Sequence, residues 1–145
     1  MSKERTKEVS DIVERSWHLL DAKGQVLGRI ATRVAVLLMG KDKPAWVPYL
    51  DLGDNVVVIN AKEVSVTGKK ETQKRYYRYS GYPGGLRSET LGQLRSRRPT
   101  EVIRHAVLGM LPKNKLASRM ITHLYIYPGP DGEMVGKVKE SQAKI

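Results

Sequence analysis

Cysteine is absent from the 145 residues of this chain. The chain therefore has no disulfides and no thiolate metal sites, and its composition is compatible with a reducing compartment. No apolar run approaches the roughly 20 residues that a membrane-spanning helix needs. Residues 1–15 have no apolar core of the kind that a signal peptide needs, and they carry four acids, whereas a transit peptide is poor in acids. We therefore expect a cytoplasmic protein with no membrane partner.

Acidic residues are scarce in one part of the chain. The whole chain has 26 Lys and Arg against 15 Asp and Glu, for a net charge of +11 and a pI of about 9.9. Residues 69–119 hold thirteen of the basic residues and three acids, so 13 − 3 = +10 of the net charge lies there. A surface this basic binds polyanions, either nucleic acid or an acidic membrane. These basic residues lie among glycines and tyrosines rather than along one face of a long amphipathic helix, which favours nucleic acid.

The centre of this basic region is residues 74–87, which read KRYYRYSGYPGGLR. Cations neutralise phosphates, and tyrosine rings stack on bases. Gly81, Gly84 and Gly85 permit positive φ and close approach of the backbone to a partner. A run of charge is often only a solvated face, but cations, rings and glycines interleaved in this way favour contact with RNA.

The first half of the chain predicts an α/β fold. Residues 17–21 are typical of a buried strand, and apolar residues recur at helical spacing over 27–39. Residues 55–60 form a β-branched run, typical of a strand covered on both faces. Two such strands on either side of a helix predict a parallel βαβ unit.

The second half continues with shorter elements. Residues 74–79 are expected to form a strand that enters the glycine loop, with 87–90 as its returning partner. Pro99 suits the first turn of a helix that Pro112 ends, Asn114 is placed to cap a last helix, and 124–127 is expected to be a short strand. We expect one α/β domain over 16–128, between a polar N-terminal extension (1–15) and a C-terminal tail (129–145).

Motifs for catalysis or cofactor binding are weak. Gly24 and Gly28 are spaced G-x-x-x-G rather than G-x-G-x-x-G, and Gly68-Lys69-Lys70 lacks the residues of a true phosphate loop. The three histidines are scattered without metal-ligand spacing. Asp51 and Asp54 are more typical of turn residues that pair with nearby basic groups than of an acid/base dyad. We expect no catalytic residue, no metal, no cofactor and no small-molecule substrate.

Several segments together resemble the bacterial type of the L-thirteen family of large-subunit ribosomal proteins. In chain order they are 27–32 (LGRIAT), 51–54 (DLGD), 67–70 (TGKK), 80–86 (SGYPGGL) and 106–114 (AVLGMLPKN). The resemblance covers about residues 16–128. It implies a three-layer α/β/α fold around a four-stranded, mainly parallel sheet, with a basic Gly/Tyr-rich RNA-binding loop. It also implies a non-catalytic protein that binds large-subunit rRNA of the 23S type, contacts neighbouring ribosomal proteins and supports assembly of the subunit.

The expected RNA-binding residues come from the resemblance and from the local density of charge. The resemblance implies contacts at Lys69, Lys70, Tyr77, Arg78, Gly81, Gly84, Lys113 and the start of the following helix. The basic and glycine-rich composition adds Arg29, Lys41, Lys43, Lys74, Arg75, Tyr82, Gly85, Arg87, Asn114, Lys115 and Arg119. The alternatives are a basic enzyme acting on nucleic acid or a phosphorylated substrate, and a free-standing RNA-binding regulator.

Overall fold

The protein is described by a computed structural model that covers residues 15–142. All of the predicted N-terminal extension except Arg15 therefore lies outside the described residues. The strands and α-helices follow in the order β1 (Trp17–Asp21), α2 (Leu27–Met39), β2 (Asn55–Ile59), α3 (Lys70–Gln73), β3 (Arg75–Tyr79), β4 (Leu86–Thr90), α4 (Leu91–Arg97), α5 (Pro99–Met110), α6 (Lys115–Met120), β5 (Leu124–Ile126) and α7 (Val135–Gln142). Short 3-10 turns span Ala61–Glu63 and Ile121–His123.

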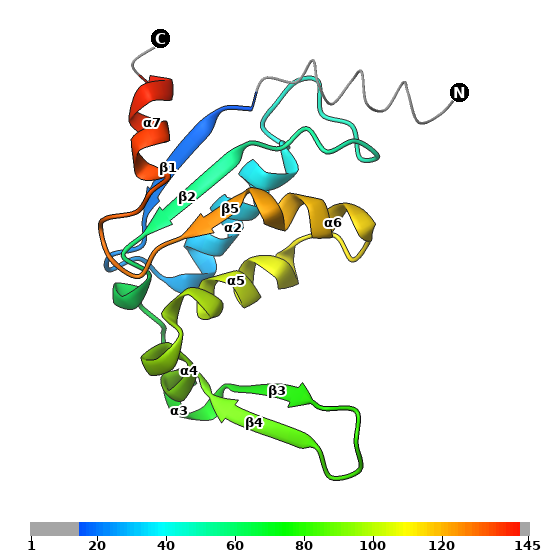
Figure 1. Cartoon of the computed structure of the whole chain (residues 1–145), viewed down its shortest axis with the longest axis vertical. Coiled ribbons are helices and arrows are strands. Elements are labelled where there is room, and N and C mark those ends of the chain that lie inside the picture. Colours follow the sequence, from blue (N-terminus) through cyan, green and yellow to red (C-terminus); the bar gives the residue numbers. More distant parts are fainter. Residues whose placement is uncertain (1–14, 143–145) are drawn as a thin grey trace.

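The central sheet is parallel, with the strand order β1-β2-β5 (Figure 1). The predicted βαβ unit is confirmed, since β1 and β2 pair in parallel and α2 connects them. The expected four-stranded sheet is not found among the described residues: the central sheet has three strands, and β3 and β4 form a separate antiparallel pair. Val26 and Ser65 form an isolated parallel bridge. This bridge does not lengthen into a fourth strand, because the chain enters α2 at Leu27, the residue after Val26.

The core lies between the sheet and helices α2 and α5. Val56 and Val58 of β2 face these helices and belong to the main apolar cluster. Val57 points to the other face of the sheet and is also fully buried. The prediction that this strand is covered on both faces is therefore confirmed.

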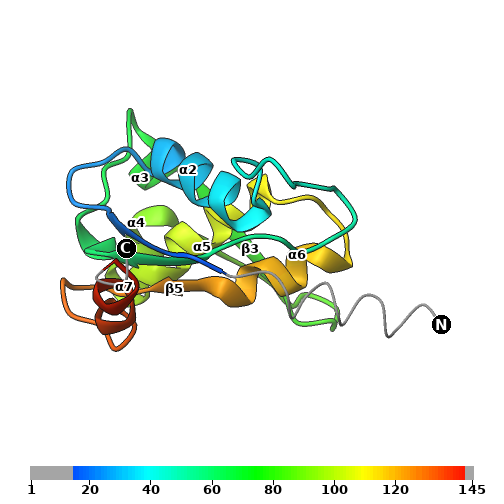
Figure 2. The ribbon, with the colours of Figure 1, turned by 90° about the horizontal axis from the view of Figure 1, so that it is seen from above.

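Helix α7 packs against β1 on the face opposite α2 (Figure 2). It lies within residues 129–145, for which the sequence predicted only a tail. Its Val138 is fully buried, and the ammonium of Lys137 lies 5.7 Å from the centre of the Trp17 ring. Helices thus cover both faces of the sheet.

Candidate nucleic-acid interface

The basic Gly/Tyr-rich segment folds as an antiparallel hairpin of β3 and β4, which projects from the α/β body (Figure 1). The predicted pairing of the two segments is confirmed. In the loop between them, Ser80 N–H donates to Gly85 O at 3.3 Å and Gly85 N–H donates to Tyr82 O at 3.0 Å. These bonds give the loop a defined shape.

Glycine is required at several positions of this loop. Gly81 and Gly84 have φ of +91° and +71°, a region that L-residues with a side chain rarely adopt. Gly85 has no positive φ, but a Cβ there would lie 2.0 Å from Ser80 Oγ. The expected positive φ is confirmed for Gly81 and Gly84, whereas Gly85 is required for space.

The alternation of side chains gives the hairpin two chemically different faces. One face carries Tyr77, Tyr79 and Leu86, whose side chains are 67%, 63% and 62% exposed. The other face carries Arg78 and Arg87, which stand directly opposite each other in the strand register. Like charges in directly opposed positions destabilise a strand pair, so the free protein bears a cost at this position that a bound anion would remove.

The root of the hairpin is anchored in the body. Tyr76 is partly buried, with its ring 5.4 Å from that of His105 on α5. Leu91 N–H donates to Lys74 O at 2.9 Å, which joins the start of α4 to the start of β3. Thr90 and Gln93 form a reciprocal capping box at the start of α4. An anchored root and an exposed outer part allow the hairpin to present its side chains to a partner without unfolding.

The acids near the hairpin are occupied by other residues. Glu71 pairs with Arg95 at 3.1 Å, and Glu89 pairs with Arg97 at 2.8 Å, so both acids are held by arginines of α4. Within residues 15–142, no ion pair involves any of the six cations of the hairpin and its approach, which are Lys69, Lys70, Lys74, Arg75, Arg78 and Arg87. These six charges, hereafter the hairpin cations, are available to a polyanion.

A second group of expected residues lies at α6. Lys113, Lys115 and Arg119 are exposed. The Asn114 side chain accepts a hydrogen bond from Ala117 N–H at 3.2 Å, so its predicted capping role is confirmed. The two views place α6 and the hairpin loop toward the same side of the molecule (Figures 1 and 2).

The remaining expected residues lie on α2 and in the loop after it. Arg29 and Lys41 are exposed, and Lys41 Nζ lies 5.9 Å from the centre of the Trp46 ring. Lys43 is different, because its Nζ donates to Leu52 O at 3.0 Å and to Asp54 at 2.5 Å. The amine of Lys43 thus stabilises the fold. Its expected contact with RNA stays a prediction.

Asp54 is a buried structural acid, only 2% exposed. Besides Lys43 it accepts hydrogen bonds from Ser16 N–H at 3.0 Å and from His18 at 2.9 Å. Burial raises the pKa of the Asp54 carboxyl, but the bonds from Lys43, His18 and Ser16 outweigh it, so the pKa lies below its usual value. The predicted pairing of this acid with basic groups is confirmed.

Asp51 belongs to the same region and has partners of its own. It lies 3.2 Å from Arg15 and 3.4 Å from His123. Burial again raises the pKa of the carboxyl, and the bonds and charges of His123 and Arg15 outweigh it and lower the pKa. Asp51 and Asp54 are therefore each engaged by two basic side chains, as expected for structural acids rather than a catalytic pair.

Tyr79 was not among the expected binding residues, although it is as exposed as Tyr77 and lies on the same face. The sequence contained the necessary signal, because residues two apart in a strand point to the same side. Tyr77 and Tyr79 therefore present their rings on the same face of the hairpin.

The fold and the hairpin define a small, basic α/β protein with a projecting arm whose cations form no ion pair with the residues that the structure describes. No helix among the described residues is both long and apolar enough to span a bilayer. The sequence model described as "Ribosomal protein L13" matches residues 15–133. The chain belongs to this family.

Individual relatives agree with this assignment. The large ribosomal subunit protein uL13c of Porphyra purpurea is 51% identical over 126 residues, which is 87% of this chain and 89% of the relative. The uL13 protein of Cyanothece sp. is 53% identical over 119 residues, covering 82% and 80%. The uL13 protein of Lachnospira eligens is 50% identical over 128 residues, covering 88% and 90%.

Proposed function

We propose that this protein is a structural constituent of the large ribosomal subunit in the cytoplasm, where it binds 23S-type rRNA and supports subunit assembly. It acts by binding and carries out no reaction. Neighbouring large-subunit proteins are its other partners. The names of the relatives support the location, and the chemistry of the hairpin supports the RNA.

The observation that carries the proposal is that the hairpin cations form no ion pair within residues 15–142. Each exposed charge contributes little to the stability of the free protein, and the repulsion between Arg78 and Arg87 lowers that stability. A phosphate backbone supplies the missing counter-charge, and binding releases its condensed counterions. The surface is therefore better suited to an RNA complex than to the free protein.

The expected residues take different roles in this complex. Hairpin cations, Lys113, Lys115 and Arg119 contact phosphates, because they are exposed and carry charge. Tyr77 and Tyr82, which are 67% and 75% exposed, offer rings for stacking on unpaired bases. Gly81, Gly84 and Gly85 shape the loop so that its backbone approaches the RNA closely.

Sedimentation of a cell lysate through a sucrose gradient tests the location. A ribosomal constituent co-sediments with large subunits in a one-to-one ratio, even after the ribosomes are dissociated into subunits. An enzyme acting on nucleic acid, or a free-standing regulator, would remain mostly in the light fractions. That distribution would overturn the proposal.

Salt dependence tests the binding mode on rRNA transcribed in vitro. If about six to ten phosphates are neutralised, affinity falls by roughly three to five orders of magnitude between about 50 and 200 mM salt, with duplex values as a guide. Filter binding across a salt series measures the slope. A flat response would contradict binding to phosphates.

A further inference from the structure

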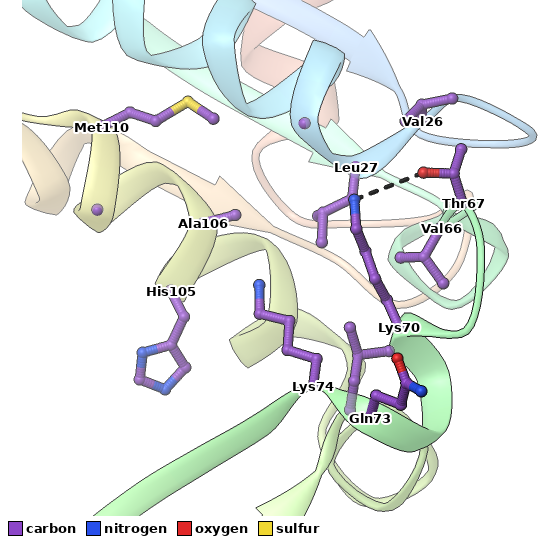
Figure 3. Close-up of a pocket in the computed structure, with 13 residues that line it drawn as sticks. Val26, Leu27, Val66, Thr67, Lys70, Gln73, Lys74, His105, Ala106 and Met110 are labelled. Carbon is purple, nitrogen blue, oxygen red and sulfur yellow. Dashed lines mark hydrogen bonds between the residues drawn. The ribbon is translucent and has the colours of Figure 1, made fainter.

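A cavity of about 620 Å³ lies beside the root of the hairpin, between the start of α2, the segment at Val66 and Thr67, α3 and α5 (Figure 3). This volume falls within the range of sites that hold small organic groups. Leu27 of α2 and Ala106 and Met110 of α5 contribute apolar surface. Nothing in the expected RNA contacts uses this apolar surface.

Two lysines supply the charge of the cavity. The side chains of Lys70 and Lys74 extend into the space between α2 and α5 (Figure 3). Lys70 Nζ lies 3.5 Å from Thr67 Oγ1, and neither lysine has an ion pair among the described residues. No Asp or Glu lines the cavity. The ammonium of Lys74 also lies 5.2 Å from the centre of the Tyr76 ring, a contact that leaves its charge without an acid. An apolar space with two ammonium groups and no acid in its lining suits a ligand that joins a flat apolar part to an anion.

Two glycines in facing helices keep the cavity open. A Cβ on Gly28 of α2 or on Gly109 of α5 would meet no atom within 4 Å. Neither glycine has a positive φ, so neither is required by the conformation of its helix. Glycine inside a helix is unfavourable relative to alanine. The free space above both glycines leaves room in the cavity for a ligand.

We propose that this cavity binds one unstacked nucleotide of the large-subunit rRNA. The base packs against Ala106, Met110 and the imidazole of His105, and the adjoining phosphate lies on Lys70 and Lys74. This assignment rests on the proposed function. A nucleotide is favoured over an apolar protein side chain because the cavity holds two lysines that have no acidic partner among the described residues, and because Lys74 directly precedes the first residue of β3.

The decisive experiment fills the cavity without changing charge. Gly109→Leu places an aliphatic side chain in the open space, and Gly136→Leu is the matched control, because Gly136 is also a helical glycine with no atom within 4 Å of its Cβ and lies on α7. Binding to rRNA transcribed in vitro is measured by filter binding over a salt series, with chemical probing of the bases on the same complexes. Thermal melting confirms that each variant is folded.

We expect Gly109→Leu to weaken binding about 5- to 150-fold, the loss that corresponds to one stacked base, with the salt slope unchanged. One base that the wild type protects should become reactive in this variant and remain protected in Gly136→Leu. The double variant Lys70→Gln, Lys74→Gln keeps the cavity open. It should lower the salt slope by about 0.7 to 0.9, the value for one phosphate, rather than by twice that amount.

The possible failures are distinguishable. If the wild type does not bind rRNA, the proposed function itself is wrong. If the wild type and Gly136→Leu bind and Gly109→Leu binds equally well with the same protected bases, the cavity holds no nucleotide. If Gly109→Leu binds rRNA normally but fails to enter large subunits, the occupant is a neighbouring protein, and the nucleotide assignment is overturned.

Discussion

The α/β body and the hairpin use charge in opposite ways. In the body, the buried carboxylate of Asp54 is met by Lys43, His18 and a backbone N–H. In the hairpin, Arg78 stands opposite Arg87, and neither has an acidic partner among the described residues. The body's charges are satisfied before any partner arrives, whereas the hairpin's charges are satisfied only by a partner.

This difference shows that charge content alone does not locate a binding surface. Lys43 and Arg78 were both expected to contact RNA, yet Lys43 pairs with Asp54, whereas Arg78 has no ion pair in the part of the chain that the structure describes. The two residues differ in whether an acid of the fold pairs with their charge. Substitutions in the body should therefore change stability, and substitutions in the hairpin should change RNA affinity.

The largest effect is expected when five hairpin cations are neutralised together, in the variant Lys69→Gln, Lys70→Gln, Arg75→Gln, Arg78→Gln and Arg87→Gln. Each lost phosphate contact lowers the salt slope by about 0.7 to 0.9, so the slope should fall by roughly three to four, the lower value if Lys74 alone holds the phosphate that it shares with Lys70. Affinity for rRNA at about 0.1 M salt should then fall by about three to four orders of magnitude. The melting temperature of the free protein should stay constant or rise slightly, because these charges have no internal partners.

The matched control removes five other exposed cations, so that the change in net charge is the same. Suitable positions, all outside the expected binding residues, are Lys23, Arg33, Lys62, Arg98 and Arg104. This control should lose much less affinity than the hairpin variant. Equal loss in both would show that rRNA responds to overall charge and that the hairpin is not the binding site.

The next effect is expected on the stability of the body. Asp54→Asn leaves the partly buried ammonium of Lys43, which is 24% exposed, without a counter-charge. Breaking a buried pair in this way costs about 3–5 kcal/mol, and partial exposure reduces the expected loss of unfolding free energy to about 2–4 kcal/mol. Chemical denaturation measures this loss. Affinity for rRNA, measured under conditions in which the variant is folded, should be unchanged.

The same carboxylates predict how stability depends on pH. The pKa values of Asp21, Asp51 and Asp54 are lowered in the folded state from about 3.8. The unfolded chain therefore binds more protons in acid, so this stabilisation is fully present above about pH 5 and is lost as pH falls through the folded pKa values. Denaturation between about pH 3 and 7 should show the loss, and Asp54→Asn should show a smaller one. An equal acid dependence in both proteins would contradict the role of Asp54.

A smaller loss of stability is expected from a cavity in the core. Val57→Ala removes fully buried apolar surface from the central strand, and Val34→Ala does the same on α2. Each should reduce the unfolding free energy by roughly 1–3 kcal/mol. In contrast, Tyr79→Ala on the exposed hairpin face should change it by less than about 0.5 kcal/mol. A larger effect at Tyr79 than at Val57 would show that the hairpin, too, is part of the stabilising core.

Features that a local sequence pattern encodes could be predicted, and features that depend on packing could not. The βαβ unit was predictable because the helical spacing over 27–39 and the β-branched run over 55–59 report burial directly. The expectation that residues 17–21 form a buried strand was wrong in one respect: β1 is a strand, but its residues are only partly buried or exposed. The hairpin was predictable because its glycines and alternating residues favour a turn between strands. Helix α7 was missed: among its residues 135–138, whose burial the structure describes, only Val138 is fully buried, too weak a signal for an amphipathic pattern.

Ion pairs were the least predictable feature. Glu71 lies next to Lys70 in the sequence but pairs with Arg95, which is 24 residues away. Asp54 similarly reaches back 36 residues to His18. Such partners are set by how the elements pack, which no local pattern records. The availability of the hairpin cations could therefore be established only from the structure.

The smallest effect, and the sharpest test of the comparison, is expected from Arg87→Glu. This change replaces two opposed positive charges with an ion pair across the strands, opposite Arg78. Cross-strand pairs of opposite charge stabilise by about 0.2–1 kcal/mol, and like charges destabilise, so the free protein should melt about 1–4 °C higher. Affinity for rRNA should fall, because one phosphate contact is lost and the new carboxylate neutralises Arg78. Arg87→Gln is the control: it removes the same cation without placing a carboxylate opposite Arg78, so it should raise the melting temperature less and lower affinity less. Stability that rises while binding falls would show that the hairpin's charges are arranged for RNA at the expense of the free protein. A lower melting temperature for Arg87→Glu would contradict this, since it would mean that Arg87 stabilises the free hairpin.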